Sequence, residues 1–259
     1  MATLAAVAGT LMAVTLTAAT AAEIKEIRFG VEASYAPFES KSPAGDLQGF
    51  DIDIGNAVCA RLKAKCVWVE NAFDGLIPAL QARKFNAINS DMSITDQRRA
   101  VIDFTDPIYV IPNQVIAKKG SGLQPTAVSL KGKHVGVLQG SSQEDFLKGH
   151  WANAGVQIVS YQDQDQVYAD LAAGRLDAAV QEAQTAQDGF LSKPAGAGFD
   201  MVGEPLKDPS TLGEGTGFGL RKGDKALQAK VDAALAELKK DGTLTALSQK
   251  YFKRDIIAK

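Results

Sequence analysis

Short apolar segments alternate with amphipathic segments along most of this 259-residue chain, and the alternation starts afresh near its middle. The first series predicts strands over 24–32, 66–70 and 85–89 and helices over 50–63 and 73–83. The second predicts strands over 134–138, 157–161 and 178–181 and helices over 143–152 and 166–173, with a further helix after the last strand. Such alternation is typical of α/β folds with mostly parallel strands. Because the series restarts, we predict two βαβ lobes rather than one continuous sheet.

A glycine-rich segment over 213–219 precedes the last part of the chain. It has some likeness to a nucleotide-binding loop, but it leads into strand-like residues instead of opening a helix after a strand. We interpret it as a flexible crossover between the lobes. Beyond it, an apolar stripe predicts a helix that ends at Gly242, and a second helix is expected over 244–251. The stripe consists of Leu227, Val231, Leu235 and Leu238.

The first 22 residues contain no charged side chain and consist largely of Ala, Val, Leu, Thr and Met. They end in small residues, and the charged part of the chain begins at Glu23. Small residues at such a boundary are typical of a signal-peptidase site, so we predict a signal peptide over 1–22, cleaved near Ala21 or Ala22. No Lys or Arg precedes the apolar run. The alternative is a membrane-anchoring helix, since about 20 apolar residues can span a bilayer.

The chain carries 28 Lys and Arg, 30 Asp and Glu and a formal net charge of -2, and no block of like charge stands out. A nucleic-acid-binding protein needs a clustered basic surface, so we expect no nucleic-acid partner. The sequence has no P-loop, HExxH, CxxC or GxSxG motif. Two histidines, His134 and His150, leave little material for a Ser-His-Asp triad or a multi-histidine metal site. We predict no metal and no cofactor, and an enzyme is less expected, although carboxylate catalysis stays open.

The two cysteines, Cys59 and Cys66, have six residues between them. In an exported protein such a pair can persist as a disulfide, which would stabilise the fold by about 2–3 kcal/mol on the chain-entropy estimate. A zinc site would need further ligands, and both histidines are distant in the sequence. We therefore predict a Cys59–Cys66 disulfide.

Three groups of segments carry a specific resemblance to a known family. They are residues 32–39 with 49–53, residues 73–80 with the Ser-Ile-Thr-x-x-Arg run over 93–98, and residues 130–141. Together they resemble family 3 of the bacterial extracellular solute-binding proteins. The likeness is to the subgroup of periplasmic lysine/arginine/ornithine- and histidine-binding proteins of ABC transporters. It extends from about Ile24 to about Ile256, and the cysteine pair matches a disulfide position of that subgroup.

The resemblance implies a type II periplasmic-binding-protein fold, in which two α/β lobes are joined by two hinge strands and hold the ligand between them. Residues 23–110 plus 214–259 are expected to form lobe one, and residues 111–213 lobe two. The implied function is capture of a cationic amino acid (lysine, arginine, ornithine or histidine) by hinge closure. The expected partner is the membrane permease of an ABC importer, and the chain is expected to be a monomer in the periplasm.

By resemblance, Arg98 binds the carboxylate of the ligand. A guanidinium offers two parallel donors to a carboxylate, and Thr95 is a suitable cap for the helix that carries Arg98. The backbone N–H groups of Ser93 and Ser142 are expected to complete this pocket. Ser142 would contribute from lobe two as the N-cap of a helix. Without the family match, the alternative for Arg98 is a surface ion pair.

The ammonium of the ligand needs an anion, and the resemblance implies Glu182 there, where related proteins commonly have Asp. A solvated glutamate at a helix start is the alternative. The ligand side chain is expected to lie between the rings of Tyr35 and Phe73, which add about 0.5–2 kcal/mol of cation–π attraction. The alternative for Phe73 is an ordinary place in the core.

A distal positive charge on the ligand is expected to meet Glu32 and Asp51. Asp91 stands where the family often has a small residue. The remaining residues that match family contacts are Ser90, Leu138, Ser141 and Gln143. Four acids opposite one base favour a cationic ligand and disfavour glutamate or aspartate. Because four acids exceed the charge of one cation, we expect one of them to point away from the cleft, with Asp91 the first candidate.

Two alternatives to transport stay open at this point. A few proteins with this fold are dehydratases of cyclohexadienyl acids that use a carboxylate in the cleft, a role for which Glu182 or Asp91 is available. A liganded solute-binding protein can also signal to a receptor, which the sequence does not separate from transport.

Overall fold

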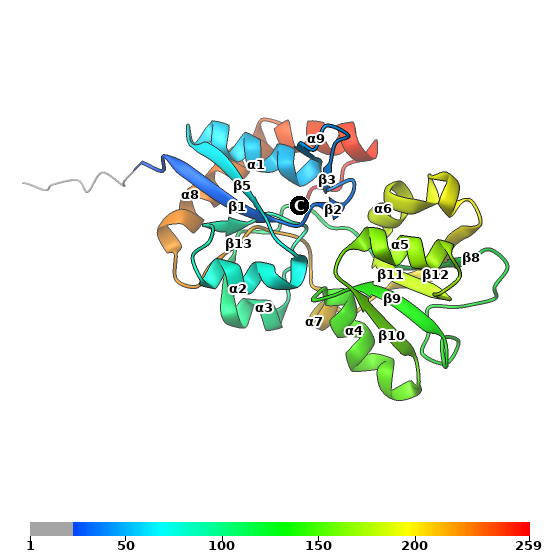
Figure 1. Ribbon diagram of the computed structural model, residues 1–259. Helices are drawn as coiled ribbons and strands as arrows, with labels where there is room; N and C mark the ends of the chain where they lie inside the picture. The colour runs from blue at the N-terminus through cyan, green and yellow to red at the C-terminus, as the bar shows by residue number, and fades with distance from the viewer. Residues whose placement is uncertain (1–22) are drawn as a thin grey trace, which may run out of the picture.

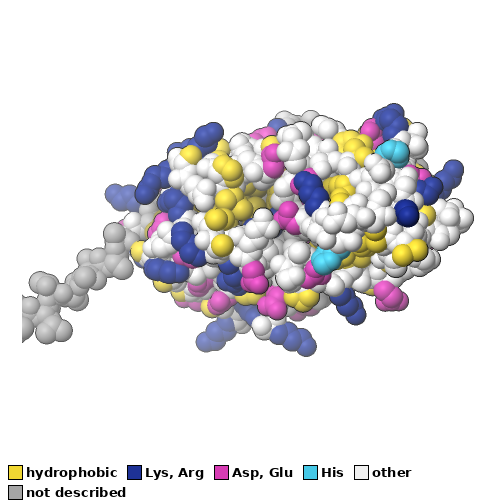
Figure 2. All heavy atoms as spheres, turned by 90° about the horizontal axis from the view of Figure 1, so that it is seen from below, with side chains coloured by type: hydrophobic (Ala, Val, Ile, Leu, Met, Phe, Trp, Pro, Cys, Tyr) yellow, Lys and Arg dark blue, Asp and Glu magenta, His cyan; other side chains and the backbone are white. Residues whose placement is uncertain are grey.

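The computed structural model describes residues 23–259, which form two lobes lying side by side (Figure 1). The predicted signal peptide, residues 1–22, lies outside this range. No helix within residues 23–259 is long and apolar enough to cross a membrane. On the face seen in Figure 2, basic and acidic side chains are interspersed with uncharged ones. The predicted α/β fold with two lobes is confirmed, and each lobe is built on its own five-stranded sheet.

Lobe one is built on a five-stranded sheet with the strand order β5-β1-β6-β13-β7. Its strands are β1 (Glu26–Val31), β5 (Lys65–Glu70), β6 (Ala87–Ile88), β7 (Ile102–Phe104) and β13 (Gly219–Arg221). Strand β1 runs parallel to β5 and β6, whereas β13 runs antiparallel to β6 and β7. The C-terminal part of the chain therefore returns to complete the first sheet.

Helices and a small sheet complete lobe one. The helices are α1 (Phe50–Arg61), α2 (Leu76–Gln81), α3 (Asp96–Val101), α8 (Lys225–Lys240) and α9 (Thr243–Phe252), and the small sheet consists of β2 (Ser34–Tyr35), β3 (Glu39–Lys41) and β4 (Leu47–Gln48). The predicted apolar stripe of α8 is buried. The helix predicted over 73–83 is instead a 3-10 turn, Phe73–Gly75, followed by α2. One reason is that Pro78 has no N–H to donate to the Asp74 carbonyl in a continuous helix.

Lobe two is built on a second five-stranded sheet, of order β10-β9-β11-β8-β12. Its strands are β8 (Asn113–Lys118), β9 (His134–Leu138), β10 (Gln157–Tyr161), β11 (Ala178–Glu182) and β12 (Phe199–Leu206). Strand β9 runs parallel to β10 and β11, and β8 runs antiparallel to β11 and β12. Val115 and Ile116, neighbours in β8, belong to different apolar clusters. Because side chains alternate along a strand, the sheet of lobe two has a core on each face.

The helices of lobe two are α4 (Ser142–His150), α5 (Gln164–Ala172), α6 (Ala183–Ala186) and α7 (Pro209–Leu212), with a π-helical turn at Gln187–Leu191. The prediction that Ser142 caps α4 is wrong by one residue. Ser141 has the extended backbone of an N-cap, and its Oγ accepts a hydrogen bond from the Glu144 N–H at 3.1 Å. Ser142 is therefore the first residue of the helix, where its N–H has no partner inside the helix.

Two passages of the chain connect the lobes, and they lie against each other. Tyr109, on the outgoing passage, forms a β-bridge with Thr216 on the return passage, and Ser93 bridges to the same threonine. The return passage starts at Gly213, whose φ is +84°. A Cβ at this position would lie 2.6 Å from the Ile94 carbonyl oxygen, so glycine is required there. The glycine-rich segment thus joins β12 of one sheet to β13 of the other.

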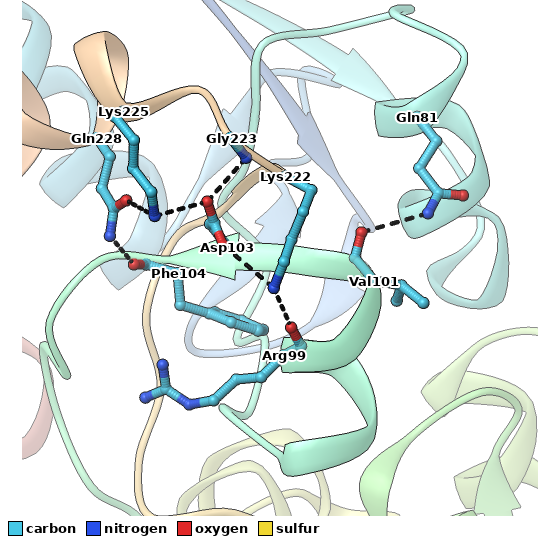
Figure 3. Close-up of polar contacts among 9 residues, drawn as sticks. All are labelled: Gln81, Arg99, Val101, Asp103, Phe104, Lys222, Gly223, Lys225 and Gln228. Carbon is cyan, nitrogen blue, oxygen red and sulfur yellow. Dashed lines mark hydrogen bonds and ion pairs between the residues drawn. The ribbon is translucent and has the colours of Figure 1, made fainter.

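A disulfide and a polar cluster fix parts of lobe one. Cys59 in α1 and Cys66 in β5 form the predicted disulfide. In the polar cluster (Figure 3), Asp103 of β7 accepts hydrogen bonds from Lys225 Nζ at 2.8 Å and from the Gly223 N–H at 2.9 Å, and Lys222 Nζ lies 3.3 Å from its other oxygen. The hydrogen bond from Lys225, with that from Gly223, lowers the pKa of Asp103 to about 2. The cluster holds the turn between β13 and α8 against β7.

Candidate ligand-binding cleft

A pocket with about 260 Å³ of empty space lies between the lobes. It contains ten of the predicted site residues, five from each lobe. Lobe one contributes Tyr35, Phe73, Asp91, Ser93 and Arg98, and lobe two contributes Leu138, Ser141, Ser142, Gln143 and Glu182. Most of these residues lie at or after the carboxyl end of a parallel strand, because β5, β6, β9 and β11 all end toward the cleft. Ligands of open α/β sheets characteristically bind at this edge.

Arg98 contributes the positive charge to the lining of the pocket. Thr95 caps α3 through its Oγ1, which accepts a hydrogen bond from the Arg98 N–H at 3.2 Å. The guanidinium donates to the carbonyl of Ser93 at 2.9 Å and, across the cleft, to the carbonyl of Gly140 at 3.1 Å. Arg98 is 6% exposed and forms no ion pair with any residue in 23–259. Burial lowers its pKa to about 10. The alternative of a surface ion pair is therefore wrong.

The two predicted serines face each other beside this guanidinium. The Oγ atoms of Ser93 and Ser142 are 3.1 Å apart, one from each lobe. Gln143 is fixed behind them by a hydrogen bond from its Nε2 to Asn113 Oδ1 at 2.5 Å. Helix α4 directs its first N–H groups toward the same region, and helix N-termini favour anions. The combination of Arg98 with the start of α4 is suited to a carboxylate.

Two aromatic rings form walls of the pocket. The Arg98 guanidinium carbon lies 5.4 Å from the centre of the Phe73 ring, within the range of a cation–π contact. Tyr35 contacts the other lobe, because its hydroxyl accepts a hydrogen bond from the Glu182 N–H at 3.4 Å. Both rings are buried, with Phe73 8% and Tyr35 6% exposed.

Asp91 and Glu182 contribute the acidic groups of the lining. Asp91, the first candidate to point away from the cleft, lines the pocket instead, and the acids outside the lining are Glu32 and Asp51. Its Oδ1 accepts hydrogen bonds from Thr216 Oγ1 at 2.9 Å and from the Tyr109 hydroxyl at 3.1 Å. Burial raises the pKa of Asp91, and burial together with the charge of Asp91 raises the pKa of Glu182. Glu182 is 4% exposed, so it is not the solvated glutamate of the alternative interpretation.

Asp51 and Ser90 lie behind the pocket rather than in its lining. Asp51 Oδ2 accepts a hydrogen bond from the Asp91 N–H at 2.7 Å, and Asp51 Oδ1 lies 2.8 Å from the Tyr109 hydroxyl. Burial, with the nearby charge of Asp91, raises the pKa of Asp51 to about 8. Ser90 Oγ donates to Glu39 Oε1 at 3.0 Å. Asp51 and Ser90 thus support the pocket from beneath.

Glu39 is an acid of this region that sequence reasoning missed. It is 1% exposed, and burial, with the charge of Asp51, raises its pKa well above the ordinary value. From the sequence, Pro37 predicts a loop at this point, and acids in loops are usually solvated, whereas in the structure Glu39 is the first residue of β3. The burial of Glu39 could be recognised only from its hydrogen-bond partner Ser90, and Ser90 lies 51 positions away in the sequence.

Glu32 also lies outside the lining of the pocket. Its Oε1 accepts hydrogen bonds from the N–H and the Oγ of Ser34, at 3.0 and 2.5 Å. Burial raises its pKa. Glu32 borders a wider groove at the mouth of the cleft, together with Glu70 of lobe one and Asp163 and Asp165 of lobe two. Lys41 lies in the same groove and forms an ion pair with Glu70 at 2.7 Å, so Glu32, Asp163 and Asp165 account for the negative charge there.

Comparisons with known proteins agree with this geometry. A family model described as bacterial extracellular solute-binding proteins, family 3, matches residues 27–254. The lysine/arginine/ornithine-binding periplasmic protein of Escherichia coli (strain K12) is 52% identical over 226 residues, which cover 87% of each chain. The histidine-binding periplasmic protein of Salmonella typhimurium (strain LT2) is 49% identical over 240 residues, covering 93% of this chain and 92% of that protein.

The fold is shared with solved structures as well. An ancestral arginine-binding protein bound to arginine has a TM-score of 0.83 and 35% sequence identity, covering 89% of this chain and 100% of that one. Two α/β lobes joined by two adjacent passages and enclosing a pocket constitute the type II periplasmic-binding-protein fold, as predicted. The chain belongs to the bacterial extracellular solute-binding proteins, family 3.

Proposed function

We propose that this protein captures a cationic amino acid (lysine, arginine, ornithine or histidine) between its lobes and delivers it to the membrane permease of an ABC importer. The observation that carries the proposal is the charge pattern of the pocket. One buried guanidinium beside a helix start faces two carboxyls and two aromatic rings. A free amino acid presents a carboxylate, an ammonium and a side chain, and each finds a complementary group there.

The balance of charges favours a positive ligand over a negative one. Arg98 neutralises the ligand carboxylate, and Asp91 and Glu182 remain for positive groups. Glu32, Asp163 and Asp165 add negative charge at the mouth of the cleft, which attracts cations and repels anions at long range. Relatives named as lysine/arginine/ornithine- and histidine-binding proteins support the same ligand class.

Capture is proposed to proceed by closure of the lobes. The Arg98 guanidinium contacts the Gly140 carbonyl, and Gln139 Nε2 donates to Asp74 Oδ2 at 2.6 Å, so both contacts join one lobe to the other. A ligand that touches both lobes binds the closed state more tightly than the open one, and this difference shifts the equilibrium to the closed state. We propose that the lobes divide after residues 110 and 213, beside the bridge of Tyr109 with Thr216.

We further propose that the protein works as a monomer in the periplasm after removal of residues 1–22. Relatives named as periplasmic proteins support this location. The Cys59–Cys66 disulfide is also expected in an oxidising compartment. Sequencing the N-terminus of the mature protein tests the cleavage site, and a first residue far from Glu23 would contradict it.

The proposed role is binding rather than catalysis, and a dehydratase of cyclohexadienyl acids is the competing function. Glu182, with its raised pKa, has the property of a general acid. The names of the related binding proteins favour binding. Incubation with prephenate or arogenate decides between the functions, because only a dehydratase forms an aromatic product.

A thermal-shift screen of the twenty common amino acids and ornithine tests the proposed function. Ligand at about 100 to 1,000 times its dissociation constant stabilises the folded state by about 3–4 kcal/mol, which corresponds to a rise of several degrees in Tm. We expect such a rise with one or more of lysine, arginine, ornithine and histidine and none with glutamate. A large rise with glutamate alone would contradict the charge argument.

A further inference from the structure

Asp91 and Glu182 bring two carboxyls from opposite lobes into one pocket. Asp91 follows β6 of lobe one, and Glu182 is the last residue of β11 in lobe two. The residues are 6% and 4% exposed. Each has one buried carboxyl oxygen that forms no hydrogen bond with residues 23–259, Oδ2 of Asp91 and Oε2 of Glu182. The two lobes therefore place two buried acids, one from each lobe, in the lining of the same small pocket.

Ionised carboxylates accept hydrogen bonds but cannot donate them. With both groups ionised, Asp91 Oδ2 and Glu182 Oε2 are buried without a hydrogen-bond partner. A hydrogen bond between the two carboxyls needs a proton. Without that proton, the two like charges are satisfied only by a positive group that lies between them.

The surroundings of the pair supply little positive charge. The titratable groups that face it are Tyr35, Glu39, Asp51, Tyr109 and Arg98. Arg98 is the cation among them, and its guanidinium donates to the carbonyls of Ser93 and Gly140. A ligand carboxylate bound to Arg98 would neutralise this positive charge. The protein itself thus leaves the Asp91–Glu182 pair without a full counter-charge.

Asp91 is held so that its carboxyl stays directed into the cleft. Its φ is +41°, a backbone conformation that costs energy for residues other than glycine. Its N–H is bonded to Asp51, and its Oδ1 is bonded to Tyr109 and Thr216. Tyr109 and Thr216 lie on the two passages that connect the lobes. The acid that faces Glu182 is therefore tied to both connections.

We propose that Asp91 makes closure of the lobes conditional on a positive charge: the Asp91 and Glu182 carboxylates meet on closing, so the closed state requires a ligand ammonium or a proton between them. This inference rests on the proposed function, from which the ligand is taken. It identifies Asp91 as a specificity-determining residue. The residue discriminates against molecules that have the carboxylate and the side chain but no ammonium beside the carboxylate.

Small-angle X-ray scattering of the ligand-free protein tests the proton requirement. We expect the wild-type protein to be open at about pH 8 and to contract toward its lysine-bound radius of gyration at about pH 5, because protonation supplies the shared proton. Asp91→Asn is expected to have the same radius at both pH values. Asp46→Asn is the control, because it removes an exposed acid that lines neither the pocket nor the groove at the cleft mouth. This control should behave as the wild type does.

Calorimetry with a ligand pair tests the ammonium requirement. The pair is arginine and its 2-hydroxy analogue, in which a hydroxyl replaces the ammonium. The measured quantity is the ratio of the affinity for arginine to the affinity for the analogue. We expect this ratio to be at least about tenfold larger for the wild-type protein than for Asp91→Asn, as for the loss of a charge-assisted contact. Should Asp91→Asn not fold, Asp91→Ser serves as the second variant, with circular dichroism as the check of folding.

An unchanged wild-type radius between about pH 8 and pH 5, or the same contraction in Asp91→Asn, would overturn the proton requirement. Equal discrimination by wild type and variant would overturn the role in specificity. If wild-type protein binds no basic amino acid at about pH 8, the proposed function itself fails. If the wild-type protein binds a basic amino acid but does not contract as the pH falls, the inference about Asp91 is contradicted and the proposed function is retained.

Discussion

The guanidinium of Arg98, in lobe one, donates a hydrogen bond to the backbone carbonyl of Gly140, in lobe two, at 3.1 Å. A second hydrogen bond, to the Ser93 carbonyl at 2.9 Å, holds the group within its own lobe. Both partners are neutral carbonyls, so neither of these hydrogen bonds neutralises the charge of the guanidinium. A planar guanidinium has five N–H donors and can serve these carbonyls and a carboxylate together.

Replacement of Arg98 is therefore expected to abolish capture. Arg98→Ala removes the counter-charge of the ligand carboxylate in a buried site, where such a loss costs about 2–5 kcal/mol, or at least about 30-fold in affinity. Calorimetric titration with lysine and arginine measures the loss. Arg99→Ala is the matched control, because Arg99 lies on the same helix but is exposed, over the Phe104 ring. Full affinity in Arg98→Ala would reject the site.

The Phe73 ring is expected to contribute to affinity for cationic side chains. Phe73→Leu keeps an apolar wall but removes the π-face, so we expect an affinity loss of about 2- to 30-fold, equivalent to about 0.5–2 kcal/mol. Phe73→Tyr retains the face and should bind nearly as the wild type does. Titration of both variants with lysine checks the difference. An unchanged affinity in Phe73→Leu would show that the ring contributes apolar surface to the pocket but no cation–π attraction.

The disulfide is expected to stabilise the protein without affecting the ligand. Cys59 and Cys66 join α1 to β5 at a distance from the pocket lining. The double variant Cys59→Ser with Cys66→Ser should lose about 2–3 kcal/mol of unfolding free energy, from the entropy of the opened loop. Urea unfolding measures this value, and calorimetry should return wild-type affinity. A large loss of affinity in the folded variant would contradict this separation.

Asp103 is expected to give a pH-dependent contribution to stability. Its hydrogen bonds with Lys225 and Gly223 lower its pKa in the folded protein to about 2, below the value of about 3.9 for the unfolded chain. A lowered folded-state pKa stabilises the protein above the unfolded-state pKa, and the contribution is lost as the pH falls through the folded-state value. Asp103→Asn should therefore be less stable than the wild type at about pH 7.

The difference in unfolding free energy between wild type and Asp103→Asn should shrink as the pH falls from about 4 to about 2. Urea unfolding of both proteins across this range provides the measurement. Asp46→Asn, which changes an exposed loop acid, is the control and should track the wild type. A difference that grows as the pH falls would contradict the assignment.

Much of the fold could be predicted from local patterns. Alternating segments gave the two α/β lobes, and the apolar stripe of α8 is buried as its spacing required. Details of the fold that depend on a single residue were harder to predict. Both Ser141 and Ser142 are able to cap a helix, and the cap is Ser141, which has an extended backbone directly after the turn at Gly140, with φ +75°. The break before α2 likewise depends on Pro78.

The candidate site could be predicted where a motif lies at a strand end. Arg98, Ser93 and Ser142 belong to such segments, and all line the pocket. Ser90 and Asp91 are neighbours, yet one lies beneath the pocket and the other in it, because the positive φ of Asp91 sets the direction of its side chain. Glu39 could not be found, because its burial depends on Ser90 and Asp51 from other parts of the chain.

The most direct test of the whole account is a crystal structure of the protein with lysine or arginine bound. We predict that the ligand lies in the pocket between the lobes, with its carboxylate within hydrogen-bond distance of the Arg98 guanidinium and its ammonium between Asp91 and Glu182. A ligand bound elsewhere, or one whose carboxylate does not contact Arg98, would contradict the account.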